Sequence, residues 1–272
     1  MNPLKYDIKT LFKYGRKLLN SDIEAELIIR NSLSLKKEEF YLNLNKEIDR
    51  ETFKKIFKNF CLRKRGFPLS YITHKKNFLD LEIEVLDGVF IPRFETEEIV
   101  YQILKKYNRV ERTLDICAGT GVIGVSLLYY GFTKFCTFVD IDDRAIENIK
   151  INLKKFNLNG AILKSDMFKE ISEKFDLIIS NPPYIKDSEY IYLPQEVKME
   201  PKSSLLGGED GLKFIKILFQ ESQNFLNENS LLIVEMEKNE LIKAERFLIN
   251  LKLVDILKTE AENIIGVVLQ KM

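Results

Sequence analysis

The stretch that decides the fold is LDICAGTGVIGVSL, residues 114–127. Its first residues continue an apolar strand, and the apolar run after Gly121 begins a helix. Gly119, Gly121 and Gly124 give the junction the spacing GxGxxG. Glycine tolerates positive φ and lets a ligand approach the backbone N–H groups of a helix N-terminus. The stretch therefore predicts a strand, a tight ligand-binding loop and a helix.

Strands and helices alternate from about residue 110 onward. We expect strands at 112–118, 134–140, 161–166, 174–180 and 230–236, and helices that begin near residues 122, 143 and 211. This alternation is typical of a parallel sheet with helices on both faces. Two last strands, near 252–258 and 264–270, have no helix between them, so one must run antiparallel. The predicted fold class is α/β, with a Rossmann-like, mostly parallel sheet and an antiparallel C-terminal hairpin.

The N-terminal part has a different pattern. FKKIFKNF places Phe53, Ile56, Phe57 and Phe60 on one helical face, and SDIE at 21–24 has the form of a capping box. FLDLEIEVLDGVFI, residues 78–91, alternates and contains a DG turn, which predicts a β-hairpin ending in VFI. The predicted domains are a small helical domain at 1–70, a β-hairpin linker at 71–95 and a Rossmann-like domain at 96–272.

The net charge of +1 hides an asymmetry. Residues 1–80 contain 18 Lys and Arg against 10 Asp and Glu, and the remainder contains 24 against 31. The net charges are therefore +8 and −7. A basic N-terminal domain could dock an acidic partner or nucleic acid, although lysines spread over helix faces are commonly there for solvation.

Composition limits the possible environment and chemistry. No apolar run approaches the ~18 residues that span a bilayer, and charges interrupt the N-terminus where a signal peptide would be apolar. The three cysteines are far apart, and there is one histidine. These features predict a cytoplasmic protein with no membrane association, no disulfide framework and no metal site.

Acidic residues at successive strand ends identify the cofactor class. Asp140 lies about 20 residues beyond the first glycine, where a carboxylate accepts the ribose hydroxyls of a nucleotide. Asp115 would repel a pyrophosphate but could attract the α-amino group of a methionine moiety. Asp166 could accept the adenine amino hydrogens while Met167 packs on the ring. The pattern favours S-adenosylmethionine over NAD.

A second polar site follows the strand that ends in IISNPPYI, residues 178–185. The side-chain oxygen of Asn181 and the carbonyl of Pro182 could accept both N–H hydrogens of a planar NH₂ group and aim its lone pair at a methyl donor. Pro182 and Pro183 would keep these acceptors rigid, and Tyr184 would supply an aromatic wall. This arrangement predicts catalysis by positioning, without a metal.

Together, DICAGTGVIGVSL, FVDID, KSDMF and ISNPPY resemble class I S-adenosylmethionine-dependent methyltransferases that act on planar nitrogens. Two further stretches, 66–100 and 193–214, resemble the HemK/PrmC family. That family methylates the side-chain amide of the glutamine in the Gly-Gly-Gln motif of class I peptide chain release factors. The resemblance covers about residues 60–270, and residues 1–60 match in size and helical character only.

The resemblance implies a set of site residues. It implies that the cofactor contacts Asp115, Cys117, Ala118, Gly119, Thr120, Gly121, Asp140, Asp166, Met167 and Asn181, and that the substrate glutamine contacts Asn181, Pro182, Pro183 and Tyr184, with Asn181, Pro182 and Tyr184 catalytic. Arg93 matches a stretch near that site and is otherwise an ion-pair partner of Glu95 or Glu97. Cys117 stands where many methyltransferases have glycine. The product would be S-adenosylhomocysteine, the partner a release factor and the protein a monomer.

Three other functions compete with this hypothesis. A DNA adenine or RNA guanine methyltransferase could grip an exocyclic amine in the same way, but the acidic balance of residues 81–272 argues against nucleic acid as the substrate. An NAD(P)-dependent oxidoreductase accounts for neither Asp115 nor NPPY. A non-catalytic nucleotide-binding module leaves NPPY without a purpose. The region 185–210 is long for a connection and is expected to face the substrate.

Overall fold

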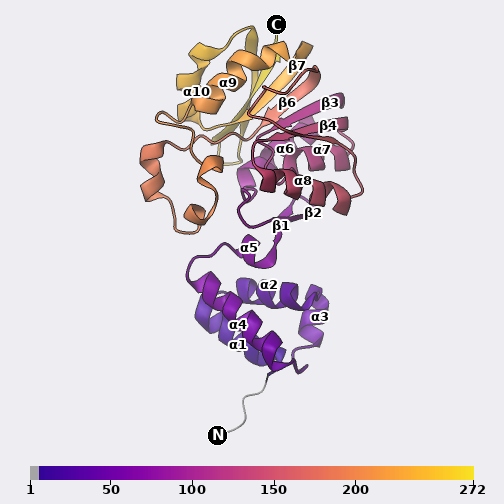
Figure 1. Ribbon diagram of the computed structural model, residues 1–272, viewed down its shortest axis with the longest axis vertical. Coiled ribbons are helices and arrows are strands. Elements are labelled where there is room, and N and C mark those ends of the chain that lie inside the picture. Colours follow the sequence, from indigo (N-terminus) through magenta and orange to yellow (C-terminus); the bar gives the residue numbers. More distant parts are fainter. Residues whose placement is uncertain (1–5) are drawn as a thin grey trace. The chain divides into compact units, whose positions relative to one another are not determined.

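The computed structural model describes residues 6–272, which form two compact units (Figure 1). One unit contains the chain up to Lys75 together with Pro194–Met199. The other contains Lys76–Leu193 and Glu200–Met272. The short segment Pro194–Met199 belongs to the long region between the NPPY motif and the next helix, but it packs with the helical unit.

The smaller unit is built from five helices. They are α1 (Ile8–Leu19), α2 (Asp22–Leu33), α3 (Lys37–Leu42), α4 (Arg50–Lys64) and α5 (Leu69–Thr73). Side chains cap three of them: Asp7 accepts from the N–H of Thr10, and Ser21 from that of Glu24. Asp49 caps α4 in the same way. These caps satisfy backbone donors that the first turn of a helix leaves free, so the polar residues before each apolar stripe explain where the helices begin.

The apolar face of α4 is narrower than the sequence predicts. Phe53, Ile56 and Phe60 are buried in the core of this unit, but Phe57 is 39% exposed, so the core covers only part of the predicted stripe. The opposing helix α1 passes very close to Phe60, because a Cβ added at Gly15 would lie 2.6 Å from the ring. Phe57 instead lies edge-on to Tyr14 of α1, with the ring centroids 6.4 Å apart.

A two-stranded hairpin begins the larger unit, with a turn that differs from the predicted one. Strands β1 (Lys75–Phe78) and β2 (Leu81–Glu84) pair across Leu79, which has φ +50°, and Asp80. Asp87 and Gly88 do form a turn, but VFI after it is not a strand. The reason is that asparagine side chains bind the backbone of Glu84 and Leu86, where a further strand would pair. The backbone N–H of Ile91 in turn donates to the carboxylate of Glu200 at 3.0 Å.

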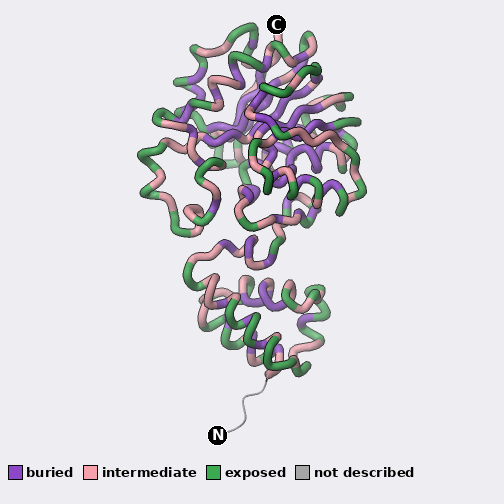
Figure 2. The backbone as a smooth tube through the Cα atoms, in the orientation of Figure 1, coloured by how far each residue is buried: buried purple, intermediate pink, exposed green. Residues whose placement is uncertain are grey.

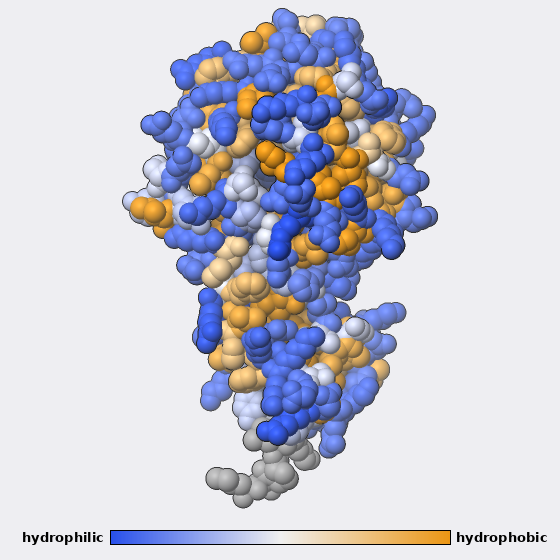
Figure 3. All heavy atoms as spheres, in the orientation of Figure 1, coloured by the Kyte–Doolittle hydropathy of each residue, from blue (hydrophilic) through white to orange (hydrophobic). Residues whose placement is uncertain are grey.

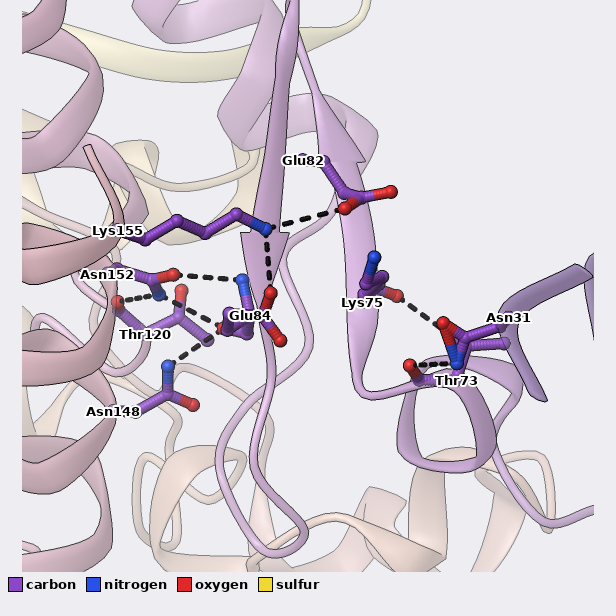
Figure 4. Close-up of polar contacts among 9 residues, drawn as sticks. All are labelled: Asn31, Thr73, Lys75, Glu82, Glu84, Thr120, Asn148, Asn152 and Lys155. Atoms are coloured by element: carbon purple, nitrogen blue, oxygen red, sulfur yellow. Dashed lines mark hydrogen bonds and ion pairs between the residues drawn. The ribbon is translucent and has the colours of Figure 1, made fainter. Parts of the chain in front are cut away.

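Two buried asparagines of helix α8 (Asp143–Lys155) bind the end of β2 (Figure 4). The backbone of Glu84 donates to Oδ1 of Asn152 at 2.8 Å, and its carbonyl accepts from Nδ2 of Asn148 and of Asn152. Asn152 also donates to the carbonyl of Thr120 at 2.9 Å. The hairpin and the glycine loop are therefore held by the same helix.

The core of the larger unit is a seven-stranded sheet with the order β5-β4-β3-β6-β7-β9-β8. Its strands are β3 (Val110–Ile116), β4 (Thr133–Asp140), β5 (Ala161–Lys164), β6 (Phe175–Ser180), β7 (Leu226–Glu235), β8 (Leu251–Lys258) and β9 (Ile264–Lys271). Strand β9 runs antiparallel to both of its neighbours, and the other pairs are parallel. The predicted parallel sheet with an antiparallel C-terminal hairpin is confirmed.

Helices cover both faces of the sheet, and its strands are largely buried between them (Figure 2). Helices α6 (Phe94–Lys106), α7 (Val122–Tyr129) and α8 pack in one core, and α9 (Lys213–Glu221) and α10 (Lys238–Ala244) in the other. A Cβ at Gly124 would lie 2.4 Å from the ring of Phe138. The third glycine of GxGxxG therefore lets α7 pack closely on β4.

The surface is mostly hydrophilic on the face drawn in Figure 3, as expected of a chain in which 31% of the residues are charged. Among residues 6–272, none of the helices combines the length and the apolar character needed to cross a bilayer.

Candidate functional site

The glycine loop connects β3 to α7 through several left-handed residues. Cys117, Gly119 and Gly121 have φ of +60°, +56° and +76°. The loop is closed by Gly121 N–H donating to the Ala118 carbonyl at 2.7 Å, and it is joined to β4 because Ala118 N–H donates to the Val139 carbonyl. Left-handed φ is unstrained for glycine and costs about 1 kcal/mol for other residues. Position 117 is therefore one that favours glycine, and Cys117 occupies it with strain.

Asp140 ends β4 directly beside this loop. Its Oδ2 accepts from Gly119 N–H at 2.8 Å, and its Oδ1 accepts from Asp142 N–H at 3.0 Å. Burial raises the pKa of Asp140, while these backbone donors oppose the shift. Each carboxylate oxygen has a second lone pair, so the side chain can still accept hydrogen bonds from two neighbouring hydroxyl groups.

Asp115 lies fully buried in β3 beneath the loop. Its Oδ2 accepts from Gly124 N–H at 2.9 Å, but within the described part of the chain its Oδ1 has no hydrogen-bond partner. Burial raises the pKa of this carboxyl to about 7, and the nearby charge of Asp140 adds to the effect. A buried acceptor without a donor is costly, and an ammonium group or a water at Oδ1 would remove that cost.

A cleft opens at the carboxyl ends of β3, β4 and β6, where ligands bind in open α/β sheets. Its lining includes seven of the predicted site residues: Cys117, Gly119, Asp140, Asp166, Met167, Asn181 and Pro183. Phe90, Phe214 and the pair Ser203–Ser204 complete much of the wall. Cys117 Sγ lies 3.8 Å from Met167 Sδ, so the two sulfur side chains are adjacent in the cleft.

The other predicted residues lie around this cleft rather than on its surface. Ala118, Thr120 and Gly121 contribute backbone to the loop, and Asp115 supports it from below. Tyr184 and Arg93 line a separate hollow that also contains Glu95, Glu235 and Glu237. Burial, reinforced by these glutamates, raises the pKa of Tyr184, so its hydroxyl stays protonated at neutral pH.

The NPPY motif begins where β6 ends. The Asn181 side-chain Nδ2 donates to Thr96 Oγ1 at 3.0 Å, and Thr96 Oγ1 donates to Glu235 Oε2 at 2.7 Å. No hydrogen bond among the described residues uses Asn181 Oδ1. Since Asn181 lines the cleft, its amide oxygen is available to accept a hydrogen bond from a ligand.

Three residues of this region escape sequence reasoning. Thr96 and Glu235 are both buried and adjoin Asn181, and burial raises the pKa of Glu235 to about 8. Glu200 is buried as well, and it accepts from Arg93 in an ion pair. The partner of Arg93 is therefore neither Glu95 nor Glu97. The only sequence signal for Glu235 is a carboxylate at the end of an apolar strand, which matches the pattern of Asp140.

Two glycines pack closely against the backbone of the NPPY motif. A Cβ at Gly207 would lie 2.7 Å from the Pro183 carbonyl oxygen, and one at Gly211 would lie 2.5 Å from that of Tyr184. Gly207 N–H also donates to the Ile185 carbonyl at 2.8 Å. The second half of the region 185–210 thus packs directly on the motif, and its GGEDG sequence is explained by the close backbone approach.

We expect Gly207→Ala to reduce methyl transfer at least tenfold, because the added methyl group must displace the Pro183 backbone. Turnover of the full chain and the dissociation constant of its methyl donor would be measured together. Gly208→Ala is the matched control, since Gly208 has φ +86° but its Cβ would meet only the Lys213 side chain, at 3.5 Å. Equal turnover losses in the two variants would contradict the interpretation.

The two buried acids predict how stability depends on pH. The pKa of Asp115 rises from 3.8 to about 7, and that of Glu235 from 4.5 to about 8. Both groups keep their protons longer in the folded state, so their contribution is fully present below about pH 4 and is lost as the pH rises to about 8. At about 1.4 kcal/mol per pKa unit, each accounts for a few kcal/mol.

Urea unfolding without methyl donor, repeated from pH 5 to 9, tests this expectation. The free energy of unfolding of the unsubstituted protein should fall more steeply with pH than that of Asp115→Asn or Glu235→Gln. Each substitution removes one titrating group while keeping the size of the side chain. Parallel curves for all three proteins would mean that neither carboxyl is protonated in the folded state.

Comparison with known proteins places the chain in a family. Residues 94–200 match the methyltransferase small domain, and residues 11–73 match the PrmC N-terminal domain. The release factor glutamine methyltransferase of Clostridium acetobutylicum is 36% identical over 80% of this chain and 80% of its own length. That of Borreliella burgdorferi is 33% identical over 84% of this chain and 81% of its own.

The fold is also similar to that of a solved methyltransferase. The crystal structure of a methyltransferase from Pyrococcus furiosus matches with a TM-score of 0.55 and 18% identity, covering 82% of this chain and 99% of that one. This supports the Rossmann-like methyltransferase architecture. Because its relatives match both the helical part and the sheet over most of their length, the chain belongs to the family of release factor glutamine methyltransferases.

Proposed function

We propose that the protein transfers a methyl group from S-adenosylmethionine to the side-chain amide nitrogen of a release factor glutamine, the glutamine of the Gly-Gly-Gln motif. The observation that carries the proposal is the orientation of Asn181. Its Nδ2 is occupied by Thr96, which leaves Oδ1 in the cleft as an acceptor for the substrate NH₂ group.

The cleft offers groups that suit each part of the methyl donor. Asp140 would accept the ribose hydroxyls, and Met167 and Asp166 would contact the adenine. The unpartnered Oδ1 of Asp115 would receive the α-amino group, directly or through water. Cys117, Ala118, Gly119, Thr120 and Gly121 would form the loop around the methionine moiety. When bound, S-adenosylmethionine supplies an electrophilic methyl carbon on a sulfonium.

The residues of the NPPY motif would promote methyl transfer by positioning the substrate amide. An amide nitrogen is a poor nucleophile, so the Asn181 oxygen and the Pro182 carbonyl would each accept one of its N–H hydrogens and direct the lone pair toward the methyl carbon. As the N–C bond forms and the C–S bond breaks, these oxygens stabilise the positive charge that develops on nitrogen. One N–H proton then leaves to solvent, and S-adenosylhomocysteine is the second product.

We also propose how the substrate reaches this site. Pro183 and Tyr184 would pack on the planar amide, and Arg93, held by Glu200, would contact the approaching protein segment. The basic helical domain, residues 1–70, would position a class I release factor, with 71–95 as the linker and 96–272 as the catalytic domain. The protein would act as a monomer in the cytoplasm, where release factors function.

A nucleic-acid exocyclic amine is the alternative acceptor, because the same two oxygens could grip it. One labelling experiment separates the possibilities. The protein is incubated with S-adenosylmethionine carrying a radioactive methyl group and with release factor, its Gln→Ala form, or duplex DNA. We expect label on unmodified release factor alone. Label on DNA, or on the Gln→Ala form, would overturn the proposed acceptor.

A further inference from the structure

Three buried or half-buried side chains form a directed hydrogen-bond chain behind the cleft. Asn181 follows β6, Thr96 lies in the first turn of α6, and Glu235 ends β7. The donor-to-acceptor distances are 3.0 Å from Asn181 Nδ2 to Thr96 Oγ1 and 2.7 Å from Thr96 Oγ1 to Glu235 Oε2. Thr96 is 2% exposed and Glu235 5%, so water does not compete for either bond.

The direction of this chain is set at its far end. Glu235 Oε2 accepts the single proton of the Thr96 hydroxyl, so the proton that this carboxyl retains at neutral pH lies on its other oxygen, Oε1. Only lone pairs of Thr96 Oγ1 then face Asn181. The NH₂ group of the Asn181 amide can donate a hydrogen bond to such a lone pair, whereas the amide oxygen cannot. With the amide turned around, two acceptors would face each other in a buried place, at a cost of several-fold to a hundredfold in population.

We propose that Thr96 and Glu235 are positioning residues that fix the side-chain amide of Asn181 with its oxygen toward the substrate nitrogen. This inference rests on the proposed function, because it assigns a direction to the amide that grips the glutamine. Neither residue touches the reacting atoms. They act through Asn181, so their loss should lower the rate of transfer and leave the binding of substrate and methyl donor intact.

Both charged and polar groups surround the Glu235 carboxyl. Glu95 and Arg93 are the charged neighbours that influence Glu235, and their effects oppose each other. Thr96 donates a hydrogen bond to Oε2 of the Glu235 carboxyl at 2.7 Å. Because Oε2 accepts from a buried hydroxyl and is shielded from water, it fixes the orientation of that hydroxyl and of the Asn181 amide that donates to it.

The test uses the full chain with release factor as substrate and three variants. Thr96→Val keeps the shape of the side chain but removes the hydroxyl, and Thr96→Ser keeps the hydroxyl. Glu235→Gln allows an NH₂ group to face Thr96 and thereby reverses the direction of the hydrogen bonds from Glu235 to Asn181. We expect kcat to fall at least thirtyfold in Thr96→Val and Glu235→Gln, with KM for release factor and Kd for S-adenosylmethionine within threefold. Thr96→Ser should keep kcat within threefold.

A matched control is available in the same sheet. Thr113 is fully buried in β3, and within the described residues its hydroxyl has no hydrogen-bond partner. Thr113→Val should therefore leave kcat unchanged, which shows that burying a valine in place of threonine does not itself slow the enzyme. Melting temperatures of all variants identify any that fail to fold, and the remaining one of Thr96→Val and Glu235→Gln then decides.

The outcomes separate the two proposals. If the unsubstituted protein does not label release factor, the proposed function fails. If it labels release factor and both Thr96→Val and Glu235→Gln retain full kcat, the positioning role is wrong. A variant that loses kcat together with affinity for the methyl donor, and that Thr96→Ser does not rescue, points to a merely structural contact and also overturns the inference.

Discussion

Replacing Asn181 with alanine should abolish methyl transfer, with kcat reduced by at least about a thousandfold. The substitution removes the oxygen that would accept one N–H of the substrate amide. The lone pair of that nitrogen is then no longer directed toward the methyl carbon. The methyl donor should still bind within about tenfold of its normal affinity, because Asp140 and the glycine loop make most of the proposed contacts with it. Single-turnover labelling and calorimetry measure the two quantities.

The control for this substitution is Asn227→Ala. Asn227 also belongs to the sheet, and its Nδ2 donates to Asp176 Oδ1 at 2.8 Å, so the change removes a comparable hydrogen bond. We expect normal turnover from that variant. If Asn181→Ala lost the methyl donor but kept most of its turnover, Asn181 would hold the donor instead of the acceptor, and the assignment of roles would be wrong.

Much of the fold could be predicted because its signals are local. The glycine loop, the alternation of strands and helices, and the final pair of strands without a helix all appear within short windows of sequence. Helix α7 begins at Val122 and α8 at Asp143, as the sequence predicts. Local patterns do not determine which strands pair with one another. VFI has strand propensity, but side chains of α8 bind the backbone at the end of β2, and Glu200 binds the backbone of Ile91.

The parts of the site that sequence reasoning missed depend on distant residues. Thr96 and Asn181 are 85 residues apart, Thr96 and Glu235 are 139 apart, and Arg93 and Glu200 are 107 apart. Such pairs leave no periodicity and no short motif. NPPY, by contrast, is contiguous, and its stiffness is visible from proline alone. A contiguous motif could be recognised in the sequence, while the side chains that contact it from distant positions became visible only in the folded arrangement.

Phe57 shows the same limit in the helical unit. Its spacing in FKKIFKNF is that of a core residue, yet it is 39% exposed while its neighbours on the stripe are buried. Helical periodicity defines a face but not how much of that face a neighbouring helix covers. Helix α1 approaches closely at Gly15, where a Cβ would meet Phe60 at 2.6 Å, whereas Phe57 meets α1 only at the exposed ring of Tyr14.

Asp140→Ala should weaken the binding of S-adenosylmethionine by about a hundredfold or more. The proposed pair of hydrogen bonds from the ribose hydroxyls to a carboxylate is worth about 1.5–3 kcal/mol per bond, and a hundredfold change corresponds to about 2.7 kcal/mol. The loss should be larger than for Asp140→Asn, which keeps one accepting oxygen. Calorimetry on the full chain gives the dissociation constants, and saturating donor should recover much of the turnover.

A nearby acid separates this effect from a change of local charge. Asp143 lies in the first turn of α8 and forms an exposed ion pair with Lys164 at 2.7 Å. Asp143→Ala removes the same charge three residues away without removing a proposed contact, so the affinity should stay within about threefold. Equal losses in the two variants would mean that the charge around the cleft, and not a specific acceptor at the end of β4, attracts the cationic donor. The contacts from Gly119 N–H and Asp142 N–H favour the specific acceptor, because they fix the Asp140 carboxylate in the wall of the cleft where the ribose would lie.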